Sequence, residues 1–155
     1  MPANRIRIAK DKVELVKALV ASKDTTGPFQ TYVEVIAFAA ALGAKHKKRI
    51  PLEAIAKDLS PLRQDYFAIG FSALINLLAI TETKEIQILG DNDIADEQRI
   101  HIFEEYANGG LEILQNELRG AVDYSERLLL ILNSERFKQE KKEEFDLSKF
   151  LSEVN

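Results

Sequence analysis

The sequence contains no cysteine, no tryptophan and a single methionine among 155 residues. Without cysteine the chain can form no disulfide, offer no thiolate nucleophile and hold no metal centre that needs thiolate ligands. It also lacks a run of about 18 apolar residues, the length that a membrane-spanning helix requires. Residues 1–8 contain no apolar signal core. We therefore expect a cytoplasmic protein.

Sequence patterns of catalysis are missing as well. There is no phosphate-cradling glycine loop, no nucleophile elbow and no zinc-protease helix. His101 precedes Glu104 and Glu105, but His-x-x-Glu reverses the order found in di-iron bundles, so we interpret it as a surface histidine beside carboxylates. The acidic segment 91–96 lacks the glycine and final glutamate of an EF-hand and is typical of a helix N-terminus. The sequence predicts no enzyme, no cofactor and no metal.

Charge is distributed unevenly along the chain. Residues 1–50 hold ten basic and four acidic side chains, whereas the remainder holds eleven basic and 21 acidic ones. This split favours a basic front that faces a polyanion and an acidic back. The alternative is two solvated faces that happen to differ in sign.

The stretch from Thr31 to Ala44 is the predicted centre of the fold. Thr31 and Glu34 form a T-x-x-E capping box, and Glu34 carries the only charge before Lys45. A helix with almost no polar face belongs in a protein core. The basic run 45–49 follows at its C-terminus, where cations complement the helix dipole.

Residues 5–8, Arg-Ile-Arg-Ile, predict a short strand. Strict alternation puts both isoleucines on one face and both arginines on the other. Such a strand needs a partner, and there are two candidates: the segment Ile86–Leu89, or the same strand of a second copy. Pairing between copies would make the protein a homo-oligomer.

Helical patterns fill most of the remaining chain, so we predict a mainly α, compact helical domain with a short N-terminal β-strand. The further helices are expected at 12–22, with Asp11 as N-cap, and at 51–59, 62–80, 94–107 and 111–137, with a cap or kink at Asn108-Gly109-Gly110. The single domain, 1–155, comprises a basic strand-helix-helix part (1–50), an acidic helical part (51–137) and a polar tail (138–155).

Two arrangements could bind DNA. Strand–helix–helix is the order of ribbon-helix-helix proteins, which read a DNA groove with paired strands. Arg5 and Arg7 would then be the outward readers, Thr31 would lie at the phosphate-binding end of the second helix, and Lys47, Lys48 and Arg49 would contact phosphates. Alternatively, 51–59 resembles the first helix of a helix-turn-helix, although Ser60-Pro61 replaces the expected turn.

Four segments together resemble the bacterial Dnd-system-associated protein four family: 5–12, 27–32, 37–44 and Phe103-Glu-Glu-Tyr-Ala-Asn-Gly-Gly-Leu-Glu-Ile-Leu114. Members are encoded beside genes for DNA phosphorothioation, in which sulfur replaces a backbone oxygen. The resemblance implies a role in DNA sulfur modification or in the restriction that depends on it, with other proteins of these systems as partners. It carries no catalytic residues. The N-terminal third also resembles the small Dnd-system protein E, a DNA-binding protein with a ribbon-helix-helix-like core.

These observations favour a non-catalytic accessory protein of a phosphorothioation system that binds DNA weakly through its basic N-terminal half. The alternative is a protein–protein adaptor that docks a Dnd or restriction component without touching DNA.

Overall fold

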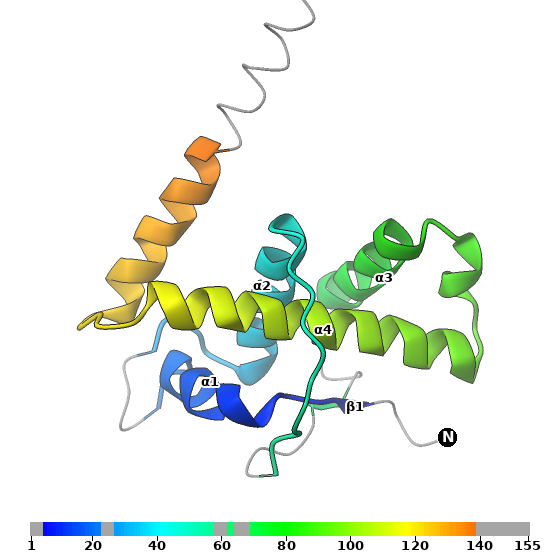
Figure 1. Ribbon diagram of the computed structural model, residues 1–155, viewed down its shortest axis with the longest axis horizontal. Helices are drawn as coiled ribbons and strands as arrows, with labels where there is room; N and C mark the ends of the chain where they lie inside the picture. Colours follow the sequence, from blue (N-terminus) through cyan, green and yellow to red (C-terminus); the bar gives the residue numbers. More distant parts are fainter. Residues whose placement is uncertain (1–4, 23–26, 58–61, 64–68, 139–155) are drawn as a thin grey trace, which may run out of the picture. The chain divides into compact units, whose positions relative to one another are not determined.

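The computed structural model describes residues 5–22, 27–57, 62–63 and 69–138 (Figure 1). Its elements are β1 (Arg5–Ile6), the 3-10 helix η1 (Lys10–Lys12), α1 (Val13–Leu19), α2 (Tyr32–Lys45), β2 (Leu62–Arg63), α3 (Ile69–Thr83), the 3-10 helix η3 (Ile86–Leu89) and α4 (Asp93–Glu117), followed by a helix over 124–138. The predicted mainly α fold is confirmed. Contacts divide the chain into two compact units, 1–116 and 117–155, and the single domain stays a prediction.

Helix α2 forms as its sequence predicts. The side chain of Thr31 accepts a hydrogen bond from the Glu34 amide at 3.2 Å, and the Glu34 carboxylate accepts one from the Thr31 amide at 3.2 Å. The reciprocal capping box therefore satisfies amides that a helix start would leave unpaired. Both α1 and α3 pack against α2, and seven of its residues are buried: Val35, Ile36, Ala37, Ala39, Ala40, Leu42 and Gly43.

Helix α4 is buried on every side over residues 102–111, which include two glutamates and an asparagine. The predicted cap or kink at Gly109-Gly110 is wrong, because α4 runs straight through it. The glycines instead allow close packing: a Cβ at Gly110 would lie 1.7 Å from the carbonyl oxygen of Ala39, and one at Gly109 would lie 1.9 Å from that of Lys48. Figure 1 shows α4 crossing α2.

The helix predicted over 111–137 is interrupted after Glu117. Helix α4 ends at Glu117, and the next helix covers 124–138. Gly120 lies in this break with a φ of 77°, a left-handed conformation that glycine adopts without a steric penalty.

Strand β1 pairs antiparallel with β2 of the same chain, Arg5 opposite Arg63 and Ile6 opposite Leu62. The predicted intrachain partner Ile86–Leu89 is wrong, because that segment is the 3-10 helix η3. The ribbon-helix-helix interpretation also needs correction, since its strand would pair with a second copy. The predicted alternation is confirmed at the residues themselves: Ile6 and Ile8 are buried, whereas Arg5 and Arg7 are exposed.

The helix predicted over 51–59 is absent from residues 51–57, and Leu59 and Ser60-Pro61 lie outside the described residues. Residues 54–56 instead extend the β pairing, with the amide of Ala56 bonded to the carbonyl of Ile8 at 2.8 Å and that of Lys10 to Ala54 at 2.9 Å. Long-range backbone pairing therefore overrides the local helical pattern. Without this helix, the helix-turn-helix alternative is wrong.

Three further helix boundaries differ from the prediction. Helix α1 ends at Leu19, not near Ser22, because Phe29 returns to this point and its amide donates to the Leu19 carbonyl at 3.0 Å. Asp11 is not the N-cap, which is Lys12 without a side-chain cap bond. The helix expected over 62–80 begins only at Ile69, since 62–63 form β2.

Candidate functional site

Two consecutive carboxylates, Glu104 and Glu105, lie in the buried middle of α4 and are 2% and 6% exposed. Successive residues of an α-helix point about 100° apart, so these two side chains leave the helix toward different neighbours. A buried carboxylate needs a charged or hydrogen-bonding partner. Each of the two receives an arginine from the basic N-terminal part.

Arg7 is the partner of Glu104. Its Nε and Nη2 atoms donate to the two carboxylate oxygens at 3.0 and 3.1 Å, and its backbone amide donates to Oε2 at 2.5 Å. The hydrogen bond to Glu104, and the charge of that group, raise the pKa of Arg7. The interaction links residues 97 positions apart in the sequence. Arg7 is thus held against α4 by three bonds, although half of its side chain is exposed.

Arg49 binds Glu105 and also a glutamate of α3. Its Nε lies 2.7 Å from Glu105, and its Nη1 lies 2.8 Å from Glu82. Burial would lower the pKa of Arg49, but the hydrogen bonds to both carboxylates more than offset it, and the pKa is raised. Glu82 also accepts a hydrogen bond from the Tyr106 hydroxyl, and His101 lies 3.2 Å from Glu105. Arg49 therefore joins α3 to α4.

Lys48 completes the set, with its ammonium 3.4 Å from Glu112. Three of the cations predicted to bind DNA, Arg7, Lys48 and Arg49, thus pair with acidic residues of α3 and α4. Part of the uneven charge distribution in the sequence is therefore explained by ion pairs within the chain. The basic part of the chain and the acidic part bind one another.

The remaining predicted residues lie elsewhere. Arg5 and Lys47 are exposed, and neither forms an ion pair with another described residue. Thr31 caps the N-terminus of α2, where the Glu34 carboxylate already binds the amides of Gln30 and Thr31. The 14 residues of α2 put this end about 21 Å from the basic run, at 1.5 Å per residue. Thr31 and the Lys47–Arg49 segment therefore do not form one site.

The two basic sets meet at the first half of α4. Arg5 and Arg7 line a hollow of about 560 Å³, and Arg49 lines another of about 510 Å³. Both hollows share Gln98 and His101 as lining residues. The structure thus brings three of the predicted arginines to adjoining hollows, with two of their guanidinium groups already paired.

The sequence reasoning missed the anionic half of this arrangement. The sequence predicts Glu82 and Glu112 only as part of an acidic back, and Glu104 and Glu105 also as carboxylates beside a surface histidine. The signal was present in Phe103-Glu-Glu-Tyr106, where two adjacent charges stand between aromatic residues in the middle of a helical pattern. Charges in such a position are buried and need partners.

The Tyr106 hydroxyl gives this network a measurable alkaline signature. Burial, followed by the hydrogen bond to Glu82, raises the pKa of Tyr106 from 10.0 to about 12. Because the folded pKa lies above the unfolded one, the stabilisation is complete below pH 10 and is lost as the pH rises toward 12. We expect the ultraviolet titration of the phenolates to show a late component near pH 12 that Tyr106→Phe removes. An unchanged titration in this variant would contradict the assignment.

Taken together, the chain is a small helical protein in which a buried acidic helix binds the arginines of a basic segment. The family model of the DNA sulphur modification system-associated protein 4 matches residues 5–150, and the chain belongs to this family. No curated protein and no solved structure matches the chain. None of the described helices is both long and apolar enough to cross a membrane.

Proposed function

We propose that this protein is a non-catalytic, cytoplasmic accessory component of a DNA sulphur modification system that works as an adaptor, binding another protein of that system. Family membership supports the setting. The observation that carries the adaptor role is a group of exposed apolar side chains on the helix 124–138, where Leu129, Leu130 and Phe137 are 63%, 57% and 62% exposed. Apolar groups gathered on a surface are typical of a protein interface.

The composition of this helix explains the exposure. Residues 128–132 are five consecutive apolar residues, which extend around every side of a helix. Leu128 and Ile131 are buried, whereas Leu129, Leu130 and Leu132 remain in contact with solvent. A helix that is apolar on all sides is stable when all sides are covered. A partner protein would cover the side that the described residues leave open.

The test uses purified proteins of the DNA sulphur modification system, added one at a time in a calorimetric titration. We expect one of them to bind, and Leu130→Ser with Phe137→Ser to weaken binding at least tenfold. Ile86→Ser is the matched control, because Ile86 is an apolar residue that is 74% exposed but lies on η3. This variant should bind the partner with the affinity of the wild type. Equal affinities for wild type and double variant, with circular dichroism showing both folded, would refute this interface.

Weak DNA binding is the second candidate, favoured by the exposure of Arg5 and Lys47. These two cations need not give up a carboxylate in order to contact phosphate, unlike Arg7, Lys48 and Arg49. Two phosphate contacts give a log–log salt slope of about −2. We expect a gel shift of plain and phosphorothioated duplexes at low salt, with Arg5→Ala and Lys47→Ala each reducing the slope by about one. No shift of either duplex would remove DNA binding.

Self-association also stays a prediction, and β1 no longer supports it. The strand pairs with β2, and on its other side the Arg7 amide donates to Glu104, so little of its backbone is open to a second copy. Light scattering tests it, because a mass above the 17.5 kDa of one chain would show self-association. A mass of 17.5 kDa at micromolar concentration would show a monomer.

A further inference from the structure

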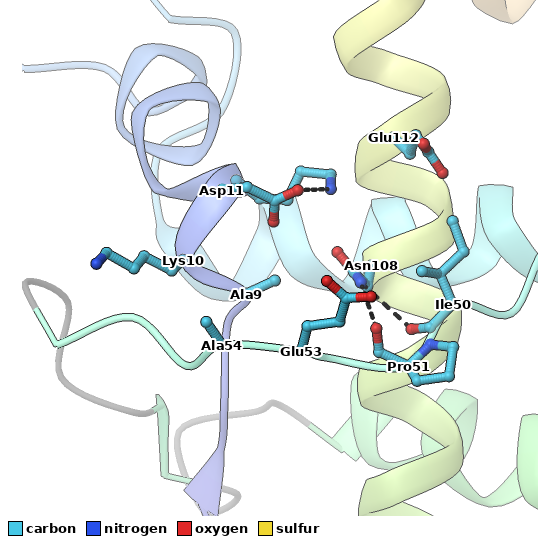
Figure 2. Close-up of a pocket in the computed structure, with 10 residues that line it drawn as sticks. Ala9, Lys10, Asp11, Ile50, Pro51, Glu53, Ala54, Asn108 and Glu112 are labelled. Atoms are coloured by element: carbon cyan, nitrogen blue, oxygen red, sulfur yellow. Dashed lines mark hydrogen bonds and ion pairs between the residues drawn. The ribbon is translucent and has the colours of Figure 1, made fainter.

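A hollow of about 590 Å³ lies between the segment around η1, residues 50–54 and α4 (Figure 2). Hollows of about 300–1,000 Å³ are typical of small-molecule sites. It is lined by Ala9, Lys10, Asp11, Lys12, Ile50, Pro51, Glu53, Ala54, Asn108 and Glu112. Neither the family nor the proposed adaptor role assigns anything to this place.

Asn108 supplies the polar floor of the hollow. It is 5% exposed, and its Nδ2 donates to the carbonyls of Ile50 and Pro51, each at 3.3 Å. These two acceptors fix the orientation of the amide, so that Oδ1 faces the other way. Oδ1 has no hydrogen-bond partner among the described residues. Buried polar atoms are nearly always paired, and this one requires a donor.

The charges around Asn108 leave one carboxylate uncompensated. The buried ammonium of Lys12 binds Asp11 at 2.8 Å, and Glu112 lies 3.4 Å from Lys48. Glu53 forms no ion pair with another described residue. Glu53 and Asn108 line the same hollow (Figure 2). The hollow therefore offers a buried acceptor and a free negative charge together.

We propose that this hollow binds a small molecule that carries a primary ammonium group. One N–H donates to Oδ1 of Asn108, and the positive charge faces Glu53. An ammonium satisfies both needs at once, because it has three donors and no acceptor. The Lys12–Asp11 pair at the wall offers a further ammonium to a ligand carboxylate. The ammonium group can therefore belong to a diamine or to an amino-acid zwitterion.

The first experiment compares amines by nuclear magnetic resonance on the full chain at low salt. The probes are 1,4-diaminobutane, glycine and tetramethylammonium, which has the same charge but no N–H group. We expect at least one of the first two to bind and to move the side-chain amide resonance of Asn108, with tetramethylammonium at least tenfold weaker. Binding of the diamine alone identifies a polyamine-type ligand, and binding of glycine alone identifies an amino acid.

The second experiment compares two charge-neutralising variants. Glu53→Gln should weaken the bound amine about tenfold, equivalent to about 1.4 kcal/mol. Glu97→Gln is the control, because Glu97 is also solvent-exposed but lines a different hollow. Both residues are on the surface, so both variants should fold. The proposal is overturned if tetramethylammonium binds as well as the primary amines, if the Asn108 resonance stays in place, or if both variants bind alike.

Discussion

Replacing Gly110 with alanine should lower the free energy of unfolding by about 3 kcal/mol, near the upper end for overpacking. A Cβ at this position would lie 1.7 Å from the carbonyl oxygen of Ala39 and 2.5 Å from its carbonyl carbon. Both atoms belong to the backbone of α2, so no side chain can rotate away. Helix α4 would have to move away from α2, and the buried side chains between them would lose contact.

Gly70→Ala provides the matched control, because no atom of the described residues lies within 4 Å of a Cβ at this α3 position. Alanine favours a helix over glycine by about 1 kcal/mol, so this variant should be equally stable or more stable. Urea denaturation of both variants measures the difference. Equal stabilities would show that α4 and α2 are not packed as closely as the structure has them.

Replacing Arg7 with alanine should destabilise the protein by about 2 kcal/mol, less than the 3–5 kcal/mol of a fully buried pair because half of Arg7 is exposed. The variant leaves the carboxylate of Glu104, which is 2% exposed, without its guanidinium partner. The backbone amide of Arg7 still donates to it, which limits the loss.

Arg5→Ala is the natural control, since Arg5 is exposed and forms no ion pair with a described residue. Its effect on stability should stay within about 0.5 kcal/mol. Adding Glu104→Leu to Arg7→Ala should recover part of the loss, because an apolar pair no longer buries an unpaired charge. Equal stability of the two arginine variants would contradict the ion pair. DNA-binding assays on Arg7 variants therefore need a stability measurement beside them.

The features that the sequence predicted well are local. The Thr31–Glu34 capping box involves residues three apart, and the alternation of Ile6 and Ile8 needs only the period of a strand. Likewise, the length of α2 follows from its nearly continuous apolar stretch. Each of these properties is decided within one or two turns of chain.

The features that it missed depend on distant residues. Gly109 and Gly110 read locally as helix breakers, but their role is set by Lys48 and Ala39, which the sequence does not place beside them. The local pattern of residues 54–56 predicts a helix, but in the structure the amide of Ala56 donates to the carbonyl of Ile8. The predicted DNA-binding arginines followed the same rule, since the carboxylates that bind Arg7 and Arg49 come from later helices.

The contact between Arg7 and Glu104 cannot form during synthesis until α4 has been made. It joins residues 97 positions apart, and β1 cannot pair with β2 before residues 62–63 have been made. A ribosome releases the chain from its N-terminal end, so residues 5–8 are free long before α4 exists. Closing so large a loop is an entropic cost that native contacts repay only afterwards. Residues 5–8 are therefore made well before the segments on which they dock, and until then Ile6 and Ile8 remain open to other chains.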